Sequence, residues 1–228
     1  MEGAACALST IQTIWNGLDW SYLTNILMSV IPALICITLH ELAHGVVAYW
    51  LGDRTAKDAG RLTLNPIRHL DMMGLLMMVV FRFGWAKPVP VNMYRFKNPK
   101  RGMAVTAVAG PLMNVLISVV CLFLYGLLFR SLGAENFWLR MVLITASLSL
   151  SFAIFNILPI SPLDGSKVLG AVLPARQYET LMRYERYGMI LLLVLVATGV
   201  LGRPLATLTQ AAFDKLFIFA EWGYELIG

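Results

Sequence analysis

Residues 40–44 read His-Glu-Leu-Ala-His, so two histidines stand four positions apart and a glutamate directly follows the first. On a helix, positions i and i+4 share a face, so His40 and His44 can bind one Zn²⁺ ion together. Glu41 would then lie beside the remaining coordination position, as general base toward a water molecule activated by the metal. The motif therefore predicts metal-dependent hydrolysis.

The motif ends an apolar stretch that is long enough to cross a bilayer. Residues 22–39, immediately before it, contain no charged side chain. The chain is 58% hydrophobic and 14% charged, whereas about a quarter of the residues in a soluble protein are charged. Ionisable groups at membrane depth are costly and indicate function by default, which argues against a chance occurrence of the motif. The sequence has no stripe of basic and interleaved aromatic residues, so a nucleic-acid partner is not expected.

The elements that must position this motif are spanning helices. A crossing needs about 20 apolar residues, and the pattern predicts an all-α membrane protein, a polytopic helical bundle of four to six transmembrane segments in one domain, residues 1–228. The expected spans are 20–50, 103–129, 141–163, 187–203 and, in addition, 205–222. The last stretch either continues its predecessor after a break or lies at the membrane interface.

A membrane-associated loop, 52–102, separates the first two spans. Its apolar piece 72–81 is too short to cross and is expected to be re-entrant or buried in protein. Segments 61–65 and 87–92 look extended, and proline confines the second to an edge or irregular strand. The sequence therefore predicts a short re-entrant or β-like element, whose free edge would suit peptide binding by β-augmentation.

Loop charge sets the expected orientation. More than half of all lysines and arginines fall within 52–102, and the positive-inside rule assigns that loop to the cytoplasm. The histidine motif then lies in the cytoplasmic half of the first span. The third span runs inward and ends near Asp164, so two distant segments converge on the same side.

Catalytic zinc sites typically use three protein ligands and one water molecule, so one ligand is still missing. Asp164 is the strongest candidate, because it ends an uncharged run and follows two prolines that break the helix. The alternative is an interfacial aspartate that caps the next helix. We expect one Zn²⁺ per chain and no other cofactor.

Four further polar positions have two interpretations each. Asn114 and Asn156 either form interhelical hydrogen bonds or donate to a substrate carbonyl; substrate contact is favoured for Asn156, and both interpretations stay open for Asn114. Glu41 is favoured as general base over a structural partner of a loop cation. His69 is expected to brace its loop, with contact to the active site as the alternative.

Three motifs in order carry a family resemblance: H-E-L-A-H-G at 40–45, A-G-P-L-M-N at 109–114 and N-I-L-P-I-S-P-L-D-G at 156–165. They resemble the site-2 protease family of intramembrane zinc metalloproteases, in its compact bacterial and archaeal form without a PDZ domain. The sequence departs from that family after Asp71 and after Asn92, where relatives commonly have proline. These departures concern loop conformation and substrate preference.

The resemblance implies that His40, His44 and Asp164 bind zinc and that Glu41 is catalytic. It also implies that single-span membrane proteins are bound as strands, with help from Asn156, and are cut within or near the lipid bilayer in regulated intramembrane proteolysis. The expected location is a prokaryotic cell membrane, with the active site toward the cytoplasm. The sequence sets no oligomeric state.

Two other classes of function remain as alternatives. One is a membrane metal-binding protein without proteolytic activity, such as a zinc carrier, although transporters often have repeated halves and this sequence shows no repeat. The other is an inactive homologue that acts as a scaffold.

Overall fold

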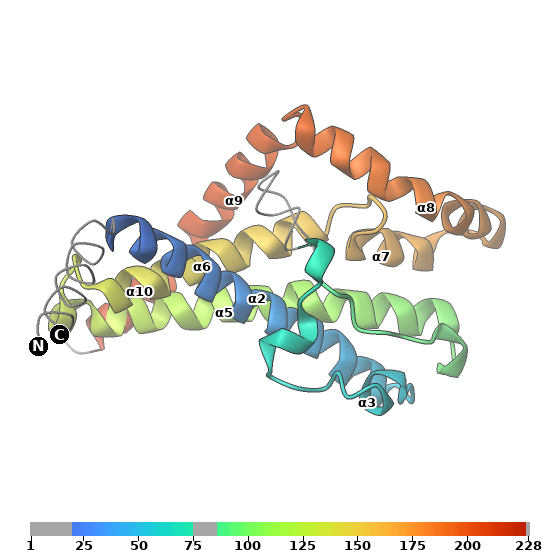
Figure 1. Cartoon of the computed structure of the whole chain (residues 1–228), viewed down its shortest axis with the longest axis horizontal. Helices are drawn as coiled ribbons and strands as arrows, with labels where there is room; N and C mark the ends of the chain where they lie inside the picture. Colours follow the sequence, from blue (N-terminus) through green and yellow to red (C-terminus); the bar gives the residue numbers. More distant parts are fainter. Residues whose placement is uncertain (1–19, 75–85, 227–228) are drawn as a thin grey trace, which may run out of the picture.

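The computed structural model describes residues 20–74 and 86–226, and nearly all regular structure in these ranges is helical (Figure 1). In chain order the elements are α2 (Trp20–Trp50), α3 (Thr55–Asp58), η1 (Pro66–His69), η2 (Met93–Arg95), α5 (Pro99–Leu132), α6 (Phe137–Asn156), α7 (Asp164–Val172), α8 (Ala175–Ala197), α9 (Gly202–Leu216) and α10 (Ile218–Glu225). Most of the apolar piece 72–81, expected to be re-entrant or buried, lies outside the described residues.

Among the described residues, three helices are long and apolar enough to cross a membrane: Leu27–Trp50 within α2, the whole of α5, and α6. A fourth crossing results if Tyr187–Ala197 and Gly202–Glu225 form one broken span, bent by 84°. One face of α5 exposes an apolar residue every three or four positions, as expected for contact with lipid. These residues are Val105, Val108, Leu112, Leu116, Val120, Leu124 and Leu128. The expected all-α membrane fold is confirmed.

Helix α5 is the centre of the bundle and contacts α2, α6, α7 and α10 (Figure 1). Small residues allow its closest approaches, as is common between membrane helices. A side chain at Gly126 would collide with the backbone of Ala220, and one at Gly223 with the carbonyl of Phe123, so α10 rests directly on the second half of α5.

The third span is shorter than the expected range 141–163. Helix α6 ends at Asn156, and residues 157–163 form turns before α7 begins at Asp164. Proline disfavours helical backbone in the residue before it, so Pro159 and Pro162 both oppose continuation of the helix. As a result Asp164 is the first residue of a new helix.

The last part of the chain also differs from the expected boundaries. Helix α8 begins at Ala175, before the expected start at 187, and ends at Ala197. The backbone turns at Gly199, whose φ of 70° suits glycine, and continues as α9 and α10 (Figure 1). The bend of 84° between Tyr187–Ala197 and Gly202–Glu225 fits either a broken span or a re-entrant loop, so membrane crossing by 205–222 stays a prediction.

Residues 86–92 form an irregular extended segment, which we call the proline segment, against residues 53–70 of the same loop. It is fastened at both ends: the Lys87 N–H donates to the His69 carbonyl (2.9 Å), and the Asn92 N–H donates to Asp53 Oδ2 (2.6 Å). Arg61 Nη2 donates to the Lys87 carbonyl at 2.6 Å. A single antiparallel bridge joins Leu70 and Ala86, and the described residues form no longer strand pairing.

Candidate metal centre

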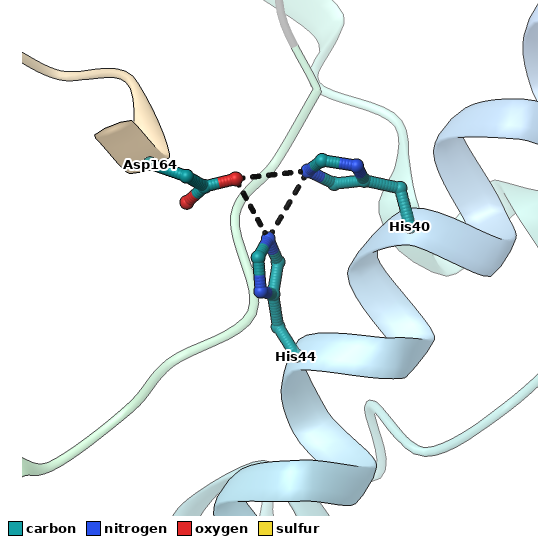
Figure 2. A group of neighbouring side chains, drawn as sticks. All are labelled: His40, His44 and Asp164. Carbon is teal, nitrogen blue, oxygen red and sulfur yellow. Dashed lines mark hydrogen bonds and ion pairs between the residues drawn. The ribbon is translucent and has the colours of Figure 1, made fainter. Parts of the chain in front are cut away.

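Three buried side chains from two distant segments converge on one point (Figure 2). His40 and His44 project from α2, and Asp164 projects from the start of α7. Asp164 Oδ2 lies 3.1 Å from His40 Nε2 and 3.0 Å from His44 Nε2, and the two nitrogens are 3.1 Å apart. Tetrahedral zinc with bonds of about 2.0–2.1 Å separates its ligand atoms by roughly 3.3 Å. The donor set therefore fits Zn²⁺ in both chemistry and spacing.

One face of α5, formed by Thr106, Gly110 and Asn114, holds both imidazoles. His44 Nδ1 lies 2.7 Å from the Thr106 carbonyl oxygen, which can only accept, so Nδ1 carries the proton and Nε2 is left as a ligand. A Cβ atom at Gly110 would overlap both rings. Helix α5 thus fixes the tautomer of one ligand and leaves room for both.

Asn114 contacts the other imidazole. Its amide nitrogen lies 3.1 Å from His40 Nδ1, while its buried Oδ1 has no hydrogen-bond partner. If His40 binds metal through Nε2, its Nδ1 carries a proton and needs an acceptor. A half-turn of the amide places Oδ1 there and gives this oxygen a partner. The orphaned oxygen is therefore what a metal-binding His40 requires.

The backbone before Asp164 is positioned by two glycines. A side chain at Gly165 would overlap the carbonyls of Ile157 and Leu158, and one at Gly188 of α8 would overlap the carbonyl of Ser161. The turn can therefore pack closely between α7 and α8. The sequence predicted the break at the prolines, but the contact with Gly188 had no recognisable signal.

Glu41 is half-buried on the same helix as the two histidines. Its Oε2 accepts a hydrogen bond of 2.8 Å from the backbone N–H of Val89, in the proline segment. The proline segment therefore runs beside the residue expected to be the general base. Val89 and Val91 also line a cavity of about 200 Å³, together with His44, Met103, Asp164 and Lys167.

The other two predicted positions lie outside the ligand group. Asn156 donates to the Phe152 carbonyl of its own helix at 3.0 Å, so its expected contact with substrate stays a prediction. His69 is fully buried, with Nε2 2.9 Å from the Thr63 carbonyl, and its own carbonyl holds Lys87. These contacts are those of a loop brace.

Sequence reasoning missed Asp53, which anchors the far end of the proline segment. Burial alone would raise the pKa of this carboxyl group, but hydrogen bonds from Thr55 and from the Asn92 N–H outweigh it and lower the pKa below its usual value. Asp53 lies between α2 and α3, and its local sequence carries no sign of a distant partner. Only the fold brings it to residue 92.

The chain is similar to known zinc metalloproteases and to one peptidase family. Residues 131–201 match the family model described as Peptidase family M50. The chain is 37% identical over 196 residues to the "Putative zinc metalloprotease YwhC" of Bacillus subtilis, an alignment that covers 82% of this chain and 88% of the relative. The chain belongs to peptidase family M50. This M50 peptidase is thus a zinc metalloprotease of the site-2 protease type.

More distant relatives have similar names. The M50 peptidase is 27% identical to the "Putative zinc metalloprotease Rip2" of Mycolicibacterium smegmatis, over 85% of this chain and 76% of the relative. It is 30% identical to the "Putative zinc metalloprotease MJ0611" of Methanocaldococcus jannaschii, over 70% and 80% respectively. No solved structure matches the chain significantly. Its apolar helices and its family make it an integral membrane protein.

Proposed function

We propose that this M50 peptidase cleaves peptide bonds within or near the transmembrane segments of membrane proteins. The proposal rests on the buried group of His40, His44 and Asp164. The two histidines belong to α2, which is long and apolar enough to span a bilayer. A substrate must reach these side chains at membrane depth. A single-span membrane protein meets that condition.

The chain's own residues have distinct roles in the proposed reaction. His40, His44 and Asp164 would hold one zinc ion, which when bound supplies Lewis-acid activation of water at neutral pH. Glu41 would take a proton from water and pass it to the leaving amine. Its hydrogen bond from the Val89 N–H would orient the carboxylate for this task. Asn114 would orient His40, and Asn156 would contact substrate backbone.

The proline segment is proposed to receive the substrate as a strand. Lys87 and Val89 each precede a proline and are therefore driven toward extended backbone. Pro88 and Pro90 have no N–H, and the Val89 N–H already donates to Glu41. On the edge that carries Val89 and Val91, the proposed pairing therefore uses the Val91 N–H and the two valine carbonyls. Both valines line the cavity beside His44 and Asp164. A substrate strand paired with that edge would pass the metal ligands.

A helical substrate has its peptide bonds protected by its own hydrogen bonds, so it must unwind before it can pair as a strand. Glycine, proline or asparagine near the cleavage site would lower that cost. The basic loop 52–102 supports an orientation in which the site opens toward the cytoplasm. We therefore expect cleavage in the cytoplasmic half of the substrate span.

The test is cleavage of a panel of single-span peptides by purified protein in liposomes, with zinc content measured in parallel. The wild type should contain about one zinc per chain and should cleave spans with helix-breaking residues preferentially. Glu41→Gln should retain zinc and lose cleavage, because the amide cannot take the proton. Glu135→Gln changes an exposed glutamate in the loop between α5 and α6 and serves as the matched control.

Zinc flux through the same liposomes separates this proposal from the carrier alternative. Metal-dependent cleavage without flux supports an intramembrane protease. Flux without cleavage, or full cleavage by Glu41→Gln, would refute the proposed mechanism.

A further inference from the structure

Lys167 lies one helical turn after Asp164 on α7 and shares the cavity with the metal ligands. Its Nζ is 3.5 Å from Asp164 Oδ1, the carboxylate oxygen that does not face the histidines. The other oxygen, Oδ2, lies within 3.1 Å of both imidazole nitrogens. The two oxygens of one carboxylate therefore have separate partners.

We propose that Lys167 is a positioning residue that keeps Asp164 a one-oxygen ligand. This inference rests on the proposed function of the same site. A carboxylate can bind a metal through one oxygen or through both. A catalytic zinc site with three protein ligands must keep its fourth position for water. If Oδ1 also turned toward the metal, it would compete for that position, and the ammonium group prevents this.

The surroundings favour this role over that of a surface ion pair. The Lys167 side chain is 32% exposed and that of Asp164 only 9%, so the ammonium group reaches from the cavity wall to a buried carboxylate. A surface ion pair, by contrast, adds little stability and fixes neither side chain. We expect the pair of Lys167 and Asp164 to act by orienting the carboxylate, because partners that fix ligand side chains affect metal affinity or activity by about 10–100-fold.

The geometry of α7 makes the contact possible. Residues three apart on a helix are neighbours on its surface, so a lysine at 167 can reach the side chain at 164. Asp164 is also the first residue of α7, where the positive end of the helix dipole favours a carboxylate. The contact with Lys167 and the helix dipole both act on the Asp164 carboxylate from α7 itself, so neither depends on the position of α2.

Co²⁺ is a suitable probe, because four-coordinate Co²⁺ absorbs visible light more strongly than five-coordinate Co²⁺. The full-length protein is loaded with Co²⁺ alone as wild type, Lys167→Met, Lys167→Gln and Lys167→Arg. Lys215→Met, which changes an exposed lysine in the last turn of α9, is the matched control. Absorption per bound ion reports coordination directly, and cleavage kinetics with Zn²⁺ are measured separately.

Lys167→Met and Lys167→Gln should bind about one Co²⁺ per chain with a loss of visible absorption per ion. Their kcat should fall about 10–100-fold, with a smaller change in KM. Lys167→Arg should restore the absorption, because it keeps a cationic donor. The glutamine variant keeps the test decisive if the methionine variant does not fold.

Two results overturn the inference, and they are distinguishable. Wild-type absorption and kcat in both neutral variants, with a normal wild type, would reject the role of Lys167 alone. A wild type that binds neither Co²⁺ nor Zn²⁺ and cleaves nothing would reject the proposed function, and this inference with it.

Discussion

Gly110→Ala adds one methyl group where α5 meets the imidazoles of His40 and His44, the two proposed metal ligands on α2. In the structure a Cβ at this position would overlap His44 Nε2 and His40 Cε1. The rings have little freedom to move away from the added methyl, because His44 is hydrogen-bonded to the Thr106 carbonyl and His40 to the Asn114 side chain. Both partners belong to α5, four residues to either side of Gly110. The added methyl therefore pushes against the helix that holds the rings.

Relief of the overlap requires the rings and α5 to separate by about 1 Å, and misplacement of this size can cost about 100-fold in rate. That factor corresponds to about 2.7 kcal/mol. We expect the zinc dissociation constant to rise 10–100-fold, and kcat/KM to fall about 100-fold at saturating zinc. Overall folding should be retained, since alanine is a better helix former than glycine.

Zinc affinity can be measured by competition with a chromophoric chelator, and kcat/KM with a cleavable single-span peptide. Gly202→Ala is the matched control, because this glycine also lies in a helix, α9, and nothing lies within 4 Å of its added methyl. Unchanged zinc affinity and kcat/KM in Gly110→Ala would show that close contact with α5 does not position the two imidazoles.

Two further predictions concern the other ends of the site. Asp164→Ala should lower zinc occupancy while the chain still folds, and metal analysis showing full occupancy would exclude Asp164 as a ligand. Asp53→Asn should raise KM and destabilise the loop by about 1–3 kcal/mol, because it weakens hydrogen bonds to a buried carboxylate. The lowered pKa of Asp53 means that its contribution is fully present above the unfolded pKa of about 3.9 and is lost as pH falls through the folded value. Thermal unfolding should therefore separate wild type from Asp53→Asn near neutral pH and bring them together in acid; a constant difference would contradict this origin.

Much of the site could be predicted because the spacing of neighbouring residues already places two candidate ligands on one helix face. The i, i+4 histidines define one helix face without knowledge of the fold. Asp164 was predictable for a different reason: loop charges gave the orientation, and two prolines gave the point where the third span ends. Both arguments use sequence patterns without knowledge of which helix faces meet, and both lead to side chains that the structure brings within 3.1 Å.

What could not be predicted depends on which helix faces meet. Gly110 and Gly188 are ordinary apolar-helix residues until the fold places an imidazole or a carbonyl against them. The same is true of Asp53, whose partner is 39 residues away. The sequence left a break open between 203 and 205, whereas the contacts of α9 with α6 and of α10 with α5 beyond the 84° bend have no local pattern.

The three sequence motifs correspond to three different tasks at one metal centre. In the proposed site the first supplies two ligands and the expected base from α2, and the roles of the other two motifs below are proposed in the same sense. The second, 109–114, supplies no ligand, and with the Thr106 carbonyl it forms the seat that fixes both rings. The third supplies the remaining ligand, with Lys167 following it in the same helix. Helices α2 and α5 hold the histidines, whereas Asp164 is positioned by the turn 157–163 and by the contacts of α7 with α5. Metal affinity therefore depends on the packing of the turn 157–163 as much as on the histidines themselves.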